Sequence, residues 1–200
     1  FPAVAAGWVI SSENFLKDNK VITWLKLRGS IGQVGSDQIG STRFAYLSTL
    51  ADAGGYNNFG INFDKGMGGL QEDQLASEDI TWEVATKYNL GLEVGLFNSL
   101  RATAEVFYEK RENIFLQPQV SEVMGLQKTM YANMGKMDNR GFEVTLEYNK
   151  MFSSGLMLTA RGNYTFARNK YIEDGKYYKN PWQDIRGTRY GERLLCDALH

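Results

Sequence analysis

The residues from Thr81 to Leu96 alternate between apolar and polar side chains, and this alternation limits the fold of the chain more than any other feature. The even positions carry Trp82, Val84, Thr86, Tyr88, Leu90, Leu92, Val94 and Leu96, whereas the odd positions carry charged, polar or small residues. Successive side chains of a β-strand point to opposite faces, while a helix would mix the two sets on its surface. The segment is therefore predicted to be a strand with one apolar and one polar face.

Five further segments follow the same pattern. The even positions of 100–112, 140–150 and 156–169 are again mostly apolar, and their odd positions are mostly charged or polar. Segments 1–11 and 22–34 fit less strictly, because Trp24 falls on the polar face; either a bulge intervenes or the alternation is offset by one residue there. About ten tilted residues suffice to cross the ~25 Å apolar band of a barrel wall, so each strand is long enough to span a membrane.

The connections between these strands differ in length. Residues 97–99 and 150–155 are predicted to be tight turns, whereas 35–80, 113–139 and 170–200 are predicted to be long loops. Transmembrane β-barrels have short periplasmic turns and long extracellular loops. We therefore predict an all-β fold, in which an antiparallel up-and-down sheet of about six long strands forms part of a large transmembrane barrel with long extracellular loops. A soluble antiparallel sheet with one wet face explains the alternation equally well, but not the unequal connections.

Composition narrows the possible functions. The 200 residues include 22 Lys and Arg and 23 Asp and Glu, so the formal net charge of −1 gives no basic excess for nucleic-acid binding. The one cysteine, Cys196, can form no internal disulfide, and the one histidine, His200, leaves little for histidine-centred catalysis. No stretch approaches the ~18–20 apolar residues of a membrane-spanning helix. The apolar run at 1–10 lacks the features of a signal peptide, so residues 1–200 are expected to be a partial barrel from a longer chain.

The alternation also assigns side chains to the two faces of the wall. With the short turns on the periplasmic side, aromatic residues gather at the extracellular ends of the apolar face, as in the girdles of membrane barrels. The predicted lipid-facing girdle consists of Trp82, Tyr108, Phe142 and Phe166, with Tyr164 as an alternative on the last strand. The predicted lumen-facing residues are Glu83, Lys87, Glu93, Arg101, Glu105, Glu143, Glu147 and Arg161. Their mixed charges favour a hydrated lining over a single-ion filter or a pair of catalytic carboxylates.

Aromatic residues in the long loops are the candidates for ligand contact. The predicted ligand-binding residues are Tyr56, Phe59, Tyr131 and Trp182, beside the further loop aromatics Phe63, Tyr177 and Tyr178. Aromatic faces stack on the apolar faces of sugars, although packing within the loops or against a partner protein explains these residues equally well. The loop residues Asn62, Asp64, Glu72 and Asp73 lack the spacing of an EF-hand. No catalytic site, metal site or cofactor is predicted.

Five ordered segments resemble strand motifs of the SusC/RagA-type TonB-linked outer-membrane proteins. They are residues 1–11, 24–37, 81–93, 108–114 and 133–143, and the resemblance runs from Phe1 to about Tyr171. It implies a barrel of about 22 strands with a plug in its lumen. It also implies TonB-driven import of oligosaccharides or peptides in the outer membrane of a Gram-negative, Bacteroidetes-like bacterium. The implied partners are outer-membrane lipid, a capping SusD-type lipoprotein, and the TonB complex through an N-terminal part expected before residue 1.

Two other functions are alternatives. A soluble or secreted β-sheet adhesin or carbohydrate-binding module would show the same alternation of apolar and polar residues. It would differ in being a stable monomer without detergent. An outer-membrane barrel enzyme would need a nucleophile and a base, and His200 is the only histidine. The sequence therefore favours a non-enzymatic section of a TonB-dependent nutrient importer.

Overall fold

The strands and turns come from a computed structural model that describes residues 1–16, 19–37, 44–120, 123 and 130–188, so that Cys196 and His200 lie outside the described part. The strands are β1 (Ala3–Val9), β2 (Ile22–Ser36), β3 (Thr49–Phe59), β4 (Lys65–Gln74), β5 (Glu83–Leu96), β6 (Leu100–Leu116), β7 (Ala132–Met151) and β8 (Met157–Glu173). Two short 3₁₀ turns accompany them, η1 (Ile10–Ser12) and η3 (Pro181–Gln183). Within the described ranges, no helix is long and apolar enough to cross a membrane.

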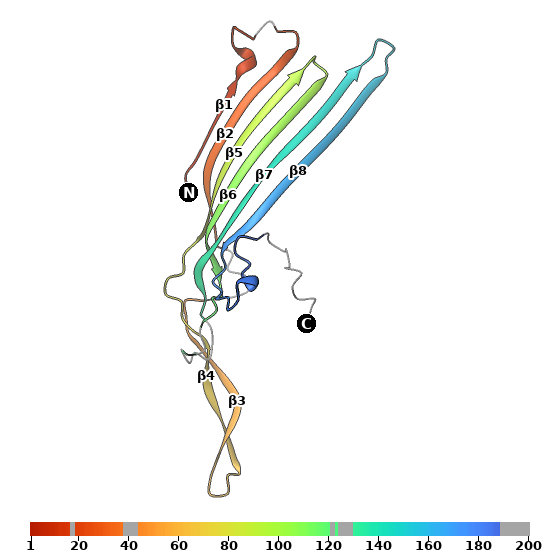
Figure 1. The fold of residues 1–200 in the computed structure, drawn as a ribbon. Helices are drawn as coiled ribbons and strands as arrows, with labels where there is room; N and C mark the ends of the chain where they lie inside the picture. Colours follow the sequence, from red (N-terminus) through yellow and green to blue (C-terminus); the bar gives the residue numbers. More distant parts are fainter. Residues whose placement is uncertain (17–18, 38–43, 121–122, 124–129, 189–200) are drawn as a thin grey trace.

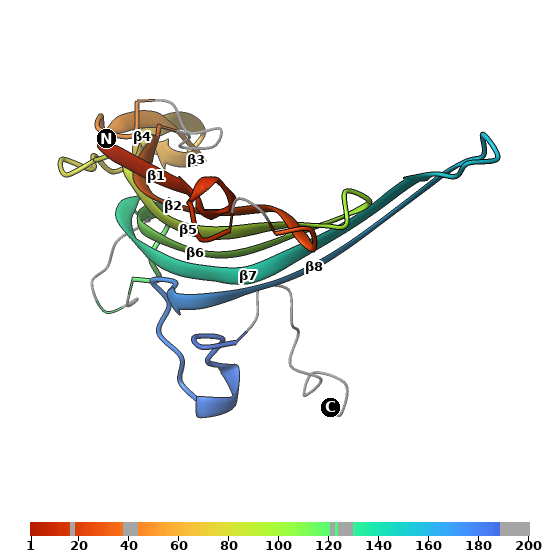
Figure 2. The same cartoon turned by 90° about the horizontal axis from the view of Figure 1, so that it is seen from above.

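Six strands form one antiparallel sheet in the order β1-β2-β5-β6-β7-β8 (Figure 1). Except for the hairpin of β3 and β4, which forms a separate two-stranded sheet, neighbours in sequence are neighbours in the sheet. Seen from above, the six strands bend into an arc (Figure 2). The predicted all-β, up-and-down section of a barrel wall is therefore confirmed.

The connections at the two ends of the sheet are unequal, as predicted. Short turns join β5 to β6 and β7 to β8 at one end, and the long connections lie at the other (Figure 1). In the β5–β6 turn, Phe97 and Asn98 both have positive φ angles, of 53° and 54°. The N–H of Ser99 donates to the carbonyl oxygen of Leu96 at 3.1 Å. This is a type I′ turn, whose twist matches that of the flanking strands and so keeps the hairpin in register.

The register between strands carries one apolar face across the sheet. One row of directly opposed residues consists of Leu90, Val106, Phe142 and Phe166. Trp24 lies on the opposite, polar face, because its indole N–H donates to the carboxylate of Glu93 at 3.3 Å. The ladder has an irregularity between Ile22 and Trp24. The bulge lies before Trp24, which is in phase with Lys26 and Arg28 and belongs to the polar face.

The three predicted long loops contain more strand than the alternation indicated, and these predictions need correction. The expected loop 35–80 holds the β3–β4 hairpin, which projects beyond the sheet (Figure 1). The expected loops 113–139 and 170–200 are shorter, since β6 continues to Leu116, β7 begins at Ala132 and β8 ends at Glu173. Outside an apolar layer both faces of a strand are wet, so alternation fades while the backbone hydrogen bonds continue.

The sheet has no hydrophobic core of its own. Within the described residues, the only buried apolar side chains are those of Ala45 and Ala85. Large side chains of the apolar face are exposed, and Leu90, Val106 and Tyr164 retain 55%, 57% and 61% of their accessible surface. A soluble sheet would cover such a face with a second layer of structure. The described part of the chain provides no such layer, so the apolar face of the sheet stays uncovered within these residues.

One glycine allows a ring and a neighbouring strand to approach closely. Gly141 lies opposite Phe107, whose ring covers it on the polar face. A Cβ at Gly141 would lie 2.5 Å from that ring and even closer to the carbonyl oxygen of Phe166. Real Cβ atoms do not tolerate such contacts, so a side chain at position 141 would displace the ring or the backbone.

Gly141→Ala is therefore expected to destabilise the full-length barrel by about 1–3 kcal/mol, because the added methyl overpacks this site. Gly162→Ala is a matched control, since a Cβ at that position meets nothing within 4 Å. Thermal unfolding in detergent measures both variants against the wild type. Equal midpoints for the two variants would contradict the close packing at Gly141.

Candidate functional site: a charged wall and a rim of long loops

The polar face of the sheet carries opposite charges that pair across several strands. At the centre lies Arg28 of β2, whose Nη2 is 2.6 Å from Oε2 of Glu105 on β6. Its Nε is 3.7 Å from Oε1 of Glu93 on β5. The side chain crosses β5 at Gly91, where a Cβ would lie only 2.7 Å from the Arg28 Nε. Gly91 thus makes room for the side chain of Arg28, which joins three strands. The side-chain amide of Asn89 also donates a hydrogen bond to Glu105.

A second group of charges lies on the same face near the long connections. The Nε of Arg111 is 2.7 Å from Oε1 of Glu109, and its Nη1 is 3.6 Å from Oε1 of Glu83. The Nζ of Lys87 is 4.0 Å from the Glu109 carboxylate. These four side chains border an open hollow of about 490 Å³. The hollow is polar and charge-balanced, which suits water and hydrogen-bonding solutes better than a single ion.

The eight residues predicted to face the lumen share this polar face. Ion pairs or hydrogen bonds place Glu83, Lys87, Glu93, Glu105, Glu147 and Arg161 there, and the register adds Arg101 and Glu143. The sequence did not indicate that Arg28 is the hub of these contacts, because Glu105 is 77 residues away along the chain. Only the pairing of β2 with β5 and of β5 with β6 brings them together.

The aromatic residues predicted to form the girdle lie on or beside the apolar face. The ring centroids of Phe142 and Phe166 are 5.7 Å apart on neighbouring strands. Tyr108 lies one strand further along, next to the row that contains these two rings. Trp82 precedes β5 and packs edge-on against Phe1, with centroids 6.3 Å apart. The rings therefore follow adjacent strands on one face of the wall.

The long connections are tied together at one rim of the sheet. The side-chain amide of Asn133 donates to the carbonyl oxygens of Thr81 and Asn113, both at 2.8 Å. Its Oδ1 accepts from the N–H of Thr81 at 3.0 Å. The N–H of Gln119 donates to the carbonyl oxygen of Gly175 at 2.9 Å. One asparagine thus joins the segment before β5 to the outer ends of β6 and β7.

Two of the predicted ligand-contacting residues lie in these rim connections. Tyr131 stacks on Phe115 of β6, with ring centroids 5.0 Å apart and planes inclined by 7°. One face of the Tyr131 ring is therefore already covered. Trp182 lies in η3 and is 62% exposed. Within the described residues, no ring contact joins Tyr131 to Trp182.

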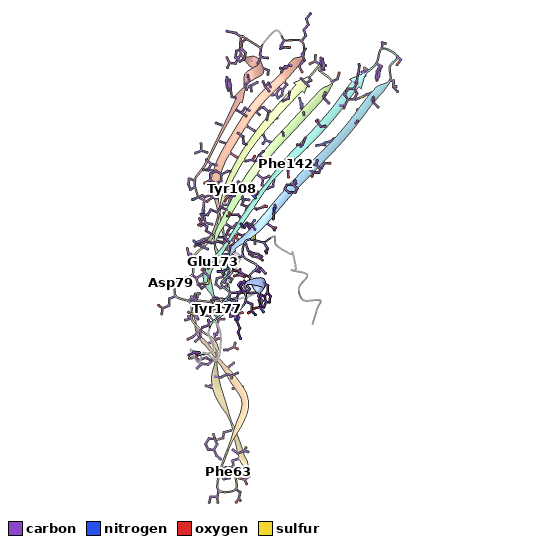
Figure 3. The ribbon with its side chains drawn as sticks, in the orientation of Figure 1. Phe63, Asp79, Tyr108, Phe142, Glu173 and Tyr177 are labelled. Atoms are coloured by element: carbon purple, nitrogen blue, oxygen red, sulfur yellow. The ribbon has the colours of Figure 1, made fainter. Side chains whose placement is uncertain are left out.

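The other two predicted residues lie on the projecting hairpin. Tyr56 lies on β3 opposite Gly68, and its side chain lies outside the described part. Phe59 is exposed and ends β3, close in sequence to Phe63 at the hairpin tip (Figure 3). The hairpin therefore carries Phe59 away from the rim, so the four aromatic residues do not form one cluster. The described residues include no group of three or more His, Cys, Asp or Glu side chains that could hold a metal ion.

The connection after β8 folds back toward the sheet, where the N–H of Gly187 donates to the carbonyl oxygen of Tyr171. The hydroxyl of Tyr178 donates to the carboxylate of Asp174, and the guanidinium of Arg186 lies 5.8 Å from the Tyr178 ring centroid. Nη2 of Arg186 also donates to Oδ2 of Asp184 at 2.7 Å. Burial of the phenol, and then its hydrogen bond to Asp174, raise the pKa of Tyr178 to about 12. Hydrogen bonds from Arg186 lower the pKa of the Asp184 carboxyl.

Residues 174–188 are expected to loosen as the pH rises from about 10 to about 12. The folded loop holds the Tyr178 proton more tightly than an unfolded tyrosine, whose pKa is 10.0. This contribution to stability is therefore complete below pH 10 and is lost as the pH passes through 12. The ultraviolet absorbance of the phenolate and the fluorescence of Trp182 would follow both events in the full-length protein. Tyr178→Phe cannot ionise and is the control; a Tyr178 that ionises near pH 10 would contradict the contact with Asp174.

Removal of Glu105 is expected to destabilise the wall more than removal of Glu147. Glu105→Ala deprives the half-buried Arg28 of its closest partner and Asn89 of its acceptor, at a cost of about 1–3 kcal/mol. The partner of Glu147 is Arg161, 3.2 Å away and 71% exposed, so Glu147→Ala should cost less than about 1 kcal/mol. Thermal unfolding of the two full-length variants in detergent compares them. Similar losses would show that Arg28 is not the hub of the charged face.

Comparison with known proteins shows that the chain is similar to TonB-dependent receptors. The sequence model of the family described as "TonB dependent receptor-like, beta-barrel" matches residues 1–194. The TonB-dependent receptor P39 of Formosa agariphila is 27% identical over 174 residues, which cover 86% of this chain and 16% of the relative. The TonB-dependent receptor SusC of Bacteroides thetaiotaomicron is 28% identical over 185 residues, which cover 89% of this chain and 18% of the relative. The chain thus spans less than a fifth of the length of these relatives.

Solved structures share the fold. The RagAB peptide importer in its closed-closed state matches with a TM-score of 0.71 at 20% identity, over 94% of this chain and 20% of that one. The structure of the RagAB peptide transporter matches with a TM-score of 0.67 at 21% identity, over 86% of this chain and 18% of that one. The predicted resemblance to SusC/RagA-type proteins is therefore confirmed, and the chain belongs to the TonB-dependent receptor-like β-barrel family.

Proposed function

We propose that the full-length protein imports nutrients across the outer membrane in a TonB-dependent manner, and that residues 1–200 supply part of its barrel wall and several extracellular loops. The observation that carries this proposal is the family match over residues 1–194, in a sheet with one apolar and one charged face. The apolar face with its aromatic girdle contacts lipid, and the polar face lines the lumen. The unequal connections orient the wall, with the short turns in the periplasm.

The charged lining suits a hydrated path for polar solutes. Arg28, Arg111 and Arg161 each have a carboxylate within 4 Å, so the lumen carries balanced charge instead of one sign. Such a lining keeps water and polar substrates in contact with hydrogen-bonding groups without holding one ion tightly. The protein is proposed to be a transporter and not an enzyme.

The substrate is proposed to be an oligosaccharide or a peptide, captured with a SusD-type lipoprotein at the extracellular mouth. The relatives include SusC, and RagAB is described as a peptide importer. Tyr131 and Trp182 belong to the rim connections, where an arriving substrate would meet them. The hairpin of β3 and β4 extends further, and its exposed Phe59 and Phe63 suit contact with the partner lipoprotein.

Tyr131→Ala and Trp182→Ala are expected to weaken substrate binding by the full-length receptor, by about tenfold for a residue that stacks on the ligand. Phe15→Ala is the matched control, because Phe15 is an exposed aromatic residue in the β1–β2 connection at the opposite end of the sheet. Calorimetric titration with the oligosaccharide or peptide that the receptor imports gives the affinities. Unchanged affinity for a rim variant would remove that residue from the binding site.

Import by the whole protein can be tested in its native host. Deletion of the gene should abolish uptake of one class among labelled oligosaccharides and peptides, and the wild-type gene should restore it. Restoration should fail when the TonB complex is inactivated, since the energy for import comes from TonB. Uptake that is unaffected by the deletion, or by the loss of TonB, would contradict the proposed function.

A further inference from the structure

Two arginine residues occupy the apolar face one row beyond Phe142 and Phe166, in the row that also contains Tyr108. Arg140 on β7 and Arg168 on β8 lie directly opposite each other in the register. Each lies two residues closer to the long-loop rim than Phe142 and Phe166, which are also opposed. Since side chains two residues apart on a strand share a face, the arginines point outward with these rings. Both are exposed.

Arg140 faces Arg168 on one side and Tyr108 on the other, so that row of the sheet contains no carboxylate next to the two arginines. Among the described residues, neither Arg140 nor Arg168 has an ion-pair partner within 4.0 Å, and in the next row Lys170 lies directly opposite the carboxylate of Asp138. Asp138, the carboxylate of that row, accepts a hydrogen bond from Tyr108 at 2.9 Å. Like charges that are directly opposed destabilise an antiparallel pair. The opposed arginines therefore favour a bound anion.

The chemistry of the surroundings indicates what kind of anion fits. On the polar face of the same sheet, Arg28, Arg111 and Arg161 all have carboxylate partners, whereas Arg140 and Arg168 lie on the outward face. These two follow Phe142 and Phe166 along their strands and lie beside the ring of Tyr108 in the register. Lipid headgroups lie at this level of a membrane protein, and aromatic rings mark it. Guanidinium groups match the oxygens of a phosphate with paired hydrogen bonds.

We propose that Arg140 and Arg168 together bind the phosphate of a lipid headgroup in the outer leaflet. Directly opposed residues have Cβ atoms about 5 Å apart, so both guanidinium groups can donate to one phosphate. The bound phosphate then replaces repulsion between the arginines with attraction to a shared anion. The inference rests on the proposed orientation of the wall, with the long loops outside the cell.

Native mass spectrometry of the purified full-length receptor tests the proposal, with phosphorylated lipid A as the probe. The variant Arg140→Gln/Arg168→Gln should bind at least about tenfold less tightly than the wild type, because it loses the charge-assisted hydrogen bonds to phosphate. Arg161→Gln removes the same charge from the opposite face of β8 and should bind as the wild type does. Lipid A without phosphate should bind the wild type about as weakly as phosphorylated lipid A binds the double variant.

Two further measurements distinguish a lipid-phosphate site from a site for free phosphate and from a purely structural role of the two arginines. Heat stability of the lipid-free double variant should equal or exceed that of the wild type, because removal of opposed charges relieves repulsion. Inorganic phosphate should compete only weakly, since it lacks the acyl chains that lie on the apolar face.

Three results would overturn the proposal. They are equal lipid A binding by the wild type and the double variant, equal binding of both forms of lipid A, and full competition by inorganic phosphate. Lipid binding is measured without transport, so its outcome is separate from that of the import experiment.

Discussion

The apolar face of the six-stranded sheet must be covered by an apolar medium, and the rest of the structure depends on this requirement. The described part of the chain buries only two small apolar side chains, while residues such as Leu90 and Val106 stay exposed. Burial of such side chains is the main source of stability for folded proteins, so a sheet of this kind needs lipid on one side. β1 and β8 are the edge strands of this sheet, and in a closed barrel neighbouring strands pair with such edges.

The polar face meets a different requirement, because like charges on neighbouring strands repel and opposite charges attract. Arg28 reaches two carboxylates by crossing a strand at Gly91, so one glycine and one arginine link β2, β5 and β6. A net charge of −1 would suit an ordinary soluble domain. That average conceals a wall in which the sheet separates charged from apolar side chains.

The fold was predictable because a membrane wall imposes a simple rule on each strand, and the alternation in 81–96 needs no partner strand to be recognised. The alternation failed in the outer part of β7 and in the β3–β4 hairpin, where water on both faces removes the periodic signal although the backbones pair. The candidate site was predictable only in part. The alternation of apolar and polar residues placed Glu93 and Glu105 on one face, but it gave no indication that both contact Arg28. It also gave no indication that Phe59 lies apart from Tyr131 and Trp182, because the hairpin carries Phe59 away from the rim.

The residues of each strand alone show which side chains belong to the apolar face and which to the polar face, because the two-residue period of a strand is a local property of the backbone. The tertiary structure decided which residues meet across strands. The opposition of Arg140 to Arg168 and the reach of Arg28 to Glu105 both follow from strand register. Register depends on the geometry of the turns and on how the apolar faces of neighbouring strands align. It therefore cannot be read from the sequence of one strand alone.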